Sequence, residues 1–166
     1  MQKQLKNSAN EECIAMLYSL KKCNRSSNFK NELARINPKT LSTSGKLRFQ
    51  FLSQKVKGTS NVLELKKMLE ATPLGNVQIP GSYYKRWCKS YFDASNNSFL
   101  AWEVLYTSKT ESQTRKKLIE AMLENPYGNA YSRALAIQAF VTEYSLGKNL
   151  KFMPDLMVNG KKLVAR

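Results

Sequence analysis

Apolar residues recur along most of this chain at spacings of three and four positions, which is the period of an amphipathic α-helix. Polar clusters and Pro or Gly residues interrupt the pattern repeatedly, so we expect short helices joined by loops. The pattern predicts helices over residues 11–22, 29–36, 46–56, 61–71, 83–94, 98–107, 111–124 and 130–146. In the last of these, one face is lined by Ala134, Ile137, Phe140, Val141 and Tyr144.

The segments between the helices are polar or irregular. Residues 1–10 are expected to be frayed, and residues 39–45 to form a loop rich in Ser and Thr. A brief extended segment is expected within residues 74–82, which hold a short β-branched run. Ser82 is expected to cap the helix that follows it, and the SNNS stretch at 95–98 to end that helix.

Two stretches, residues 47–76 and 100–129, align without a gap and predict a duplicated helical hairpin. Each reads as an apolar helix, a polar turn, an amphipathic helix and then Pro-x-Gly-Asn. The alternative is two similar hairpins without duplication, because searching many offsets also produces chance identities. The identical pairs are Leu47 and Leu100, Leu52 and Leu105, Leu65 and Leu118, Pro73 and Pro126, Gly75 and Gly128, and Asn76 and Asn129.

These patterns predict an all-α fold of seven to eight short helices in a helical-hairpin, repeat-like arrangement. The 166 residues suit a single domain spanning 1–166, with a basic N-terminal third at 1–60 and a basic tail at 148–166. No apolar run is long enough to span a bilayer, and the first residues lack a signal-peptide pattern. Cys13, Cys23 and Cys88 form no C-x-x-C pair and are expected to be buried reduced thiols inside a cell.

Charge is the strongest functional signal. The chain has 27 Lys and Arg against 12 Asp and Glu, a formal net charge of +15. Residues 1–60 hold 12 basic and 3 acidic residues, a net +9, while residues 61–110 reach +2 and residues 111–166 reach +4. Because such an excess repels itself in a compact state, it favours a polyanionic partner, with nucleic acid first and an anionic membrane surface second.

Catalytic signatures are absent from the sequence. The chain has no histidine, no phosphate-binding or nucleophile-elbow motif, and no clustered carboxylates. We therefore expect a protein that is not an enzyme, with no cofactor, no catalytic residues and no metal site.

The strongest local binding signal is the segment 82–92, SYYKRWCKSYF. As a helix it would place Tyr84, Trp87, Cys88 and Tyr91 on one side, with cations around them. The cations suit phosphates and the aromatics suit unpaired bases, although the aromatics are equally typical of a core-facing stripe. The candidates are Lys85, Arg86 and Lys89 for phosphate contact, and Tyr83, Tyr84 and Trp87 for stacking.

Two further basic clusters are candidates for phosphate contact, with an ordinary solvated surface as the alternative reading. The denser lies in the N-terminal third: Lys21, Lys22, Arg25, Lys30 and Arg35. The other lies near the start of a predicted helix, where cations oppose the helix dipole: Arg115, Lys116 and Lys117.

The run at 150–165 contains KF, LMVNGKK and a later Ala, including Lys161 and Lys162. It resembles the opening helix and turn of the seventh small-subunit ribosomal protein family. The resemblance covers about a tenth of the chain and implies an all-α protein that holds small-subunit ribosomal RNA through basic loops. In that family the run stands near the start, whereas here it stands at 150–165. This position suggests a split ribosomal protein completed by a second chain, a divergent organellar ribosomal protein, or a chance match.

The leading hypothesis is a non-catalytic RNA-binding structural protein of the small subunit of a (mitochondrial) ribosome. Its expected partners are RNA, in the first place rRNA, and neighbouring ribosomal proteins, in the mitochondrial matrix or the cytoplasm. One alternative is a DNA-binding or nucleocapsid protein of a mobile element or virus, which shares the charge. A second alternative is a helical scaffold for protein interactions.

Overall fold

The structure is a computed structural model that describes the backbone of residues 2–23, 29–59, 61–81, 83–84, 88–89, 91–125, 129–144, 156–158 and 161–163. Side chains are described for residues 10–23, 29–59, 61–81, 94–125 and 129–144. The helices are α1 Gln2–Lys22, α2 Lys30–Arg35, the 3-10 helix η1 Pro38–Thr40, α3 Thr43–Lys57, α4 Val62–Lys66, α5 Tyr91–Thr107, α6 Ser112–Leu123 and α7 Ala130–Tyr144. The strands are β1 Glu70–Ala71, β2 Val77–Gln78, β3 Tyr83–Tyr84, β4 Cys88–Lys89, β5 Leu156–Val158 and β6 Lys161–Leu163. The fold is mainly helical, which confirms the all-α prediction.

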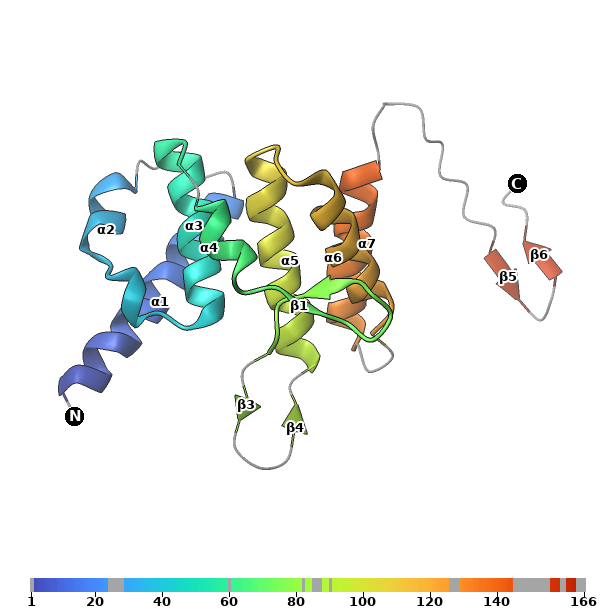
Figure 1. Ribbon diagram of the computed structural model, residues 1–166, viewed down its shortest axis with the longest axis horizontal. Helices are drawn as coiled ribbons and strands as arrows, with labels where there is room; N and C mark the ends of the chain where they lie inside the picture. The colour runs from blue at the N-terminus through green and yellow to red at the C-terminus, as the bar shows by residue number, and fades with distance from the viewer. Residues whose placement is uncertain are drawn as a thin grey trace.

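Helix α5 is the centre of the helical body. It packs against α3 on one side and against α6 and α7 on the other, while α1 packs on α3 (Figure 1). Its Leu100, Val104 and Leu105 are buried in one continuous apolar core that also contains Leu47 and Leu118. Burying such side chains is the main favourable contribution to folding, which explains why the most apolar helix lies in the middle.

The leucines that recur between the two aligned stretches all lie in this core. Leu47, Leu52 and Leu65 are buried, and so are Leu100, Leu105 and Leu118. The second helices differ in length, since α4 runs Val62–Lys66 and α6 runs Ser112–Leu123. Packing in the core is enough to explain why leucine occurs at both sets of positions. The duplication of the hairpin therefore stays a prediction.

The Asn residues that close the two stretches have different roles. Asn76 is buried and its Nδ2 donates to Glu124 Oε1 at 2.6 Å. Asn129 instead caps α7, accepting from the backbone N–H of Ser132 at 2.9 Å. Before Asn76 the chain turns tightly through Gly75, which adopts a φ of +85° that favours glycine, and β1 then pairs antiparallel with β2. This pairing explains why the predicted helix 61–71 ends early.

The predicted helix 83–94 is wrong in its first part, and only its last residues, from Tyr91, are helical as the start of α5. Tyr83 and Tyr84 form β3, which pairs antiparallel with Cys88 and Lys89 of β4. Tyrosine favours extended backbone, and this preference outweighs the helical spacing of the aromatics. The expected placement of Tyr84 and Cys88 on one helix face therefore does not occur.

The polar stretch at 95–98 lies inside α5 instead of ending a helix. Ser95, Asn97 and Ser98 are buried and use their side chains to hold other segments. Ser98 Oγ accepts from the backbone N–H of Ile79 at 3.0 Å, and Asn97 Nδ2 donates to the carbonyl of Pro80 at 3.0 Å. Satisfied polar groups of this kind are tolerated in a core, and propensity alone does not reveal them.

Two predictions near the N-terminus also need correction. The first helix begins at Gln2, so residues 2–10 are helical instead of frayed. The expected loop 39–45 contains part of η1 and the first turn of α3. Ser42 caps α3 by accepting from the backbone N–H of Gly45 at 3.1 Å. The Glu11 carboxylate accepts in turn from the backbone N–H of Ser42.

Helix α7 occurs where it is predicted, but its buried face is different. Leu135, Ala136 and Ala139 face the core, whereas Ile137 is 56% exposed and Phe140 and Val141 are also exposed. Small alanines allow close approach to α5 and α6, so packing selects the face with small side chains.

The thiols and the terminal run also differ from expectation. Cys13 is half-buried and Cys23 is exposed, so these two are not the buried thiols that were predicted. In the terminal run, Leu156–Val158 and Lys161–Leu163 pair as an antiparallel hairpin, with Met157 opposite Lys162. The helix implied by the ribosomal resemblance is therefore not formed at these positions.

Candidate nucleic-acid interface

The predicted N-terminal cations are spread over separate elements. Lys21 and Lys22 end α1, Lys30 and Arg35 lie on α2 and are exposed, and Arg25 lies outside the described residues. Lys22 is engaged within the chain, since its Nζ lies 2.5 Å from Glu103 Oε1. These residues therefore do not form a single cluster in the part of the chain that the structure describes.

Glu103 ties α1 to α5 through a second partner as well. Its carboxylate accepts from the hydroxyl of Tyr18, and the Arg48 guanidinium lies 5.9 Å from the Tyr18 ring centroid. Burial, together with the charge and hydrogen bonding of Glu103, raises the pKa of Tyr18 far above its ordinary range. Glu103 and its partners thus hold α1 and α5 together, which explains why the Glu103 carboxylate is tolerated in a buried position.

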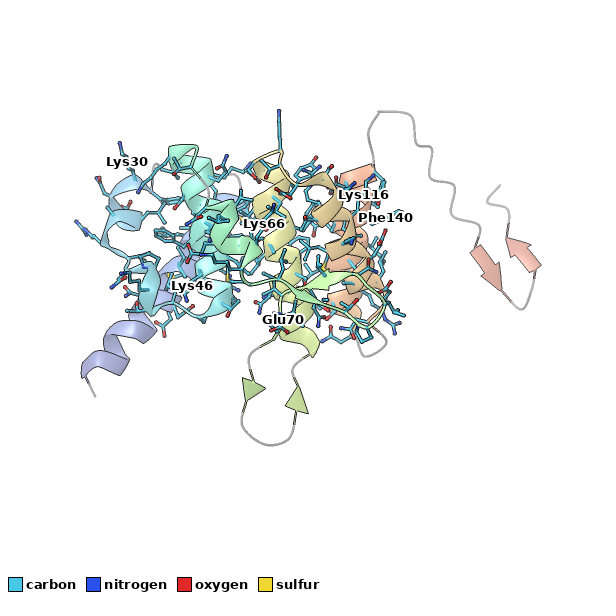
Figure 2. All side chains as sticks on the ribbon, in the orientation of Figure 1. Lys30, Lys46, Lys66, Glu70, Lys116 and Phe140 are labelled. Atoms are coloured by element: carbon cyan, nitrogen blue, oxygen red, sulfur yellow. The ribbon has the colours of Figure 1, made fainter. Side chains whose placement is uncertain are left out.

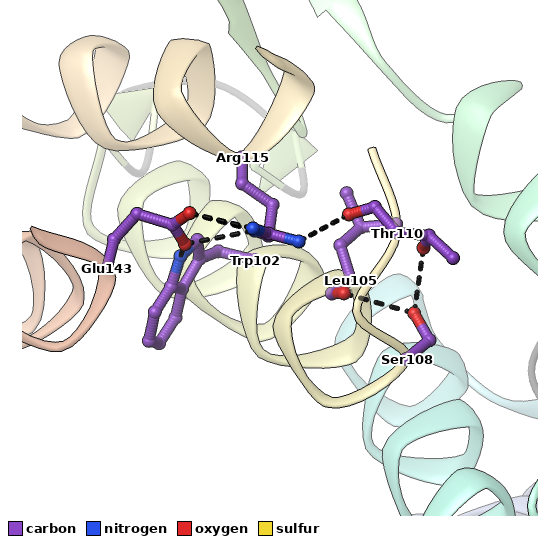
Figure 3. A network of polar contacts seen from close by, with 6 residues as sticks. All are labelled: Trp102, Leu105, Ser108, Thr110, Arg115 and Glu143. Carbon is purple, nitrogen blue, oxygen red and sulfur yellow. Dashed lines mark hydrogen bonds and ion pairs between the residues drawn. The ribbon is translucent and has the colours of Figure 1, made fainter. Parts of the chain in front are cut away.

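Arg115 was predicted to contact phosphate, but the structure places it in a buried network (Figure 3). Its Nε lies 2.9 Å from Glu143 Oε2 and its second terminal nitrogen 2.8 Å from Glu143 Oε1, a bidentate pair. The remaining terminal nitrogen donates to the carbonyl of Thr110 at 2.6 Å. Trp102 Nε1 also donates to Glu143 Oε2, at 3.0 Å. The side chains of Arg115 and Glu143 are 13% and 7% exposed, so this cation is committed to joining α6 to α7.

The environment of Glu143 favours its charged form. Burial on its own would raise the pKa of Glu143. The hydrogen bonds from Arg115 and Trp102, with the positive charges of Arg115 and Lys116, outweigh burial, so this pKa lies below its ordinary value.

Lys116 and Lys117 are exposed on α6, and Lys116 Nζ lies 5.9 Å from the ring centroid of Tyr144. In Figure 2, Lys116 and Lys30 lie at opposite ends of the helical body. The two predicted clusters are therefore too far apart to hold one phosphate group between them.

The remaining predicted residues lie in segments 82–90 and 159–163, outside the described side chains. Lys85, Arg86 and Trp87 lie outside the described residues. Tyr83, Tyr84 and Lys89 lie in β3 and β4, and Lys161 and Lys162 in β6, where the backbone alone is described.

The structure does bring three other lysines together. Lys39 of η1 and Lys46 and Lys57 of α3 line one groove of about 660 Å³ between η1, α3 and the start of α4. Within the described residues none of the three forms an ion pair, so their charges remain available to a ligand. Lys46 and Lys30 lie in the same half of the helical body (Figure 2).

The rest of the groove is mixed in character. Phe49 is half-buried and offers an aromatic edge or face, and Gln50 and Ser53 are buried polar residues beside it. Glu64 is the one carboxylate among the described lining residues, and it accepts from Asn61 Nδ2 at 3.2 Å. The groove therefore combines a net positive charge with an aromatic ring and hydrogen-bonding groups, which suits a nucleotide chain.

Sequence reasoning missed this groove, although part of its signal was visible. Lys46, Phe49, Gln50, Ser53 and Lys57 recur at helical spacing and so share one stripe of α3. Lys39 belongs to a separate element, and nothing in the local pattern places it opposite that stripe.

Other kinds of site are not found in the described part of the chain. Across those residues no group of three or more His, Cys, Asp or Glu side chains is arranged to hold a metal ion. None of the described helices combines the length and apolar character that crossing a bilayer requires. No protein-family model, characterised protein or solved structure matches this chain.

Proposed function

We propose that this chain is a non-catalytic RNA-binding protein that contacts the RNA backbone through lysine and arginine side chains. The observation that carries the proposal is the groove lined by Lys39, Lys46 and Lys57, which have no ion-pair partner among the described residues. A net charge of +15, of which residues 1–60 contribute +9, supports the same conclusion, because these residues include most of the groove lining.

In the proposed mechanism, lysine side chains neutralise phosphate charges, and the packed helices hold these lysines in fixed positions. Phosphates that approach the lysines release condensed counterions, which supplies most of the affinity and makes it depend on salt. Helices α3 and α5, packed through Leu47, Leu52 and Leu100, fix the positions of the cations and so determine the path of the RNA.

The finer proposal is that the RNA belongs to the small subunit of a (mitochondrial) ribosome. Its support is the resemblance of residues 150–165 to the seventh small-subunit ribosomal protein family. The basic composition and the mainly helical fold agree with what that resemblance implies, whereas residues 156–158 and 161–163 of the run itself form a strand hairpin in place of the implied helix.

The test is binding of a structured RNA measured by fluorescence anisotropy over a series of salt concentrations. We expect the logarithm of the association constant to fall linearly with the logarithm of the salt concentration, because each neutralised phosphate releases counterions. Binding that is absent, or that does not change with salt, would contradict the proposal.

Two further measurements separate the finer readings. Competition between duplex DNA and structured RNA distinguishes an RNA-binding protein from a DNA-binding one. Co-sedimentation of the intact protein with small-subunit ribosomal particles tests the ribosomal assignment, which recovery of free protein alone would refute.

A further inference from the structure

A buried amide in the lysine groove has an unsatisfied hydrogen-bonding group. Gln50 lines the groove with Lys46 and is only 6% exposed. Among the described residues its Oε1 receives no hydrogen bond. A buried acceptor without a donor is unfavourable, and native proteins retain few of them, so each one calls for a physical reason.

We propose that this groove binds one ribonucleotide of a single-stranded RNA. Its phosphate lies near Lys46, and a hydrogen-bond donor of the nucleoside binds Gln50 Oε1, one turn further along α3. Lys39 and Lys57 line the same groove and are available to the neighbouring phosphates of the strand. The inference rests on the proposed RNA-binding function and names the part of the RNA that this groove takes. Suitable donors are the ribose 2′-hydroxyl and the N–H groups of a base.

The dimensions and lining of the groove fit this ligand. Its volume of about 660 Å³ lies within the roughly 300–1,000 Å³ typical of small-ligand sites. Phe49 offers the aromatic surface on which an unstacked base packs, which favours a single strand over a duplex. Glu64 repels a phosphate from the α4 end, so the phosphate is directed toward Lys46, near the start of α3.

Gln50 has to turn slightly to make the proposed contact. Its Oε1 is shielded from solvent in the free protein, so the proposed contact requires the Gln50 side chain, which lines the groove, to rotate when the RNA binds. Side-chain rotamer changes of this size are common when proteins bind their partners, and the backbone of α3 can stay in place.

The experiment uses the full chain and a labelled mixed-sequence single-stranded RNA about a dozen nucleotides long. Gln50→Leu is expected to weaken binding about five- to tenfold, because the nucleoside donor loses its acceptor. Gln54→Leu is the matched control, since Gln54 lies one turn further along α3, also has an unpaired Oε1 within the described structure, and does not line the groove. Thermal unfolding shows whether each variant is folded, and Gln50→Leu should be at least as stable as the parent.

The lysines are tested in the same way. Lys46→Ala should lower the slope of log affinity against log salt by about 0.7, the value for one phosphate of a single strand. Lys55→Ala is its control, because Lys55 lies on the same helix over the Phe51 ring and outside the groove.

Single-stranded DNA of the same sequence identifies the donor that binds Gln50 Oε1. If Gln50→Leu weakens binding of RNA but not of DNA, the donor is the 2′-hydroxyl; if it weakens both, the donor is on the base.

The outcomes separate the two levels of the proposal. If RNA still binds with its salt dependence while each groove variant matches its control, the nucleotide site is refuted and the general function stands. If neither RNA nor a mononucleotide binds, both are refuted. If adenosine or uridine monophosphate binds in a Gln50-dependent manner and RNA does not, the ligand is a free nucleotide and the assignment to RNA is overturned.

Discussion

The guanidinium of Arg115 is enclosed by partners from within the chain: two carboxylate oxygens of Glu143 and the carbonyl of Thr110. Removing one member of such a buried pair leaves an uncompensated charge in a poorly solvated place. The network therefore makes α6 and α7 depend on each other, and it removes one cation from the surface offered to nucleic acid.

We expect Arg115→Met to lower the free energy of unfolding by about 3 kcal/mol, because it leaves the Glu143 carboxylate buried without its partner. The double variant Arg115→Met with Glu143→Leu should recover part of that loss, since no charge then remains buried, while the Trp102 indole N–H loses its acceptor. Urea denaturation measures both. The exposed pair of Lys66 and Glu111, with Nζ and Oε1 2.7 Å apart, is the control, and Lys66→Met should leave the midpoint nearly unchanged.

The lowered pKa of Glu143 also predicts how stability depends on pH. Its folded-state pKa lies below the ordinary value of 4.5, so on acidification the unfolded chain takes up a proton first. The stabilisation from this group is complete above pH 4.5 and is lost as the pH falls below that value, through the folded-state pKa. Urea denaturation at several pH values should show a shallower acid loss for Glu143→Gln than for the parent, and identical slopes would contradict the assignment.

At the scale of the elements, α7 shows how packing chooses a helix face. Ala136 and Ala139 lie against the core, while Ile137 and Phe140 face outward. Because a close helix contact needs small side chains, volume and not hydrophobicity alone determines which face is buried.

This packing predicts opposite results for two substitutions in one helix. Ala139→Leu should destabilise the protein by about 1–3 kcal/mol, because added methylenes do not fit a filled contact. Ile137→Gln should change stability by less than about 0.5 kcal/mol, since its side chain is largely in solvent. Chemical denaturation of the two variants tests this, and an equal loss in both would show that the buried face is assigned wrongly.

Helix existence could be predicted from the sequence more reliably than helix limits or faces. The spacing of apolar residues predicts the helix at Ala130–Tyr144 and the burial of Leu47 and Leu100. It fails at Tyr83 and Tyr84, where helical and extended preferences compete. It also fails at Ser98, because only the folded structure brings the backbone of Ile79 to its hydroxyl.

At the scale of the whole molecule, the positive charge has two different uses. Lys22 and Arg115 neutralise buried or partly buried carboxylates and hold helices together. Lys39, Lys46 and Lys57 have no such partner in the described structure and line one groove from two elements. Charge density along the sequence identified the basic third at 1–60, but it could not separate these uses, because burial and partners are properties of the fold.

Gln50 and Gln54 occupy successive turns of α3 with their amide oxygens unsatisfied in the described structure. Laboratory evolution for heat tolerance alone should replace both with apolar residues, because each is a thermodynamic burden when the chain is isolated. Imposing RNA capture on the same library should preserve glutamine at position 50 and leave position 54 free to change. Comparing positions 50 and 54 within one helix thus separates selection for stability of the fold from selection for RNA binding.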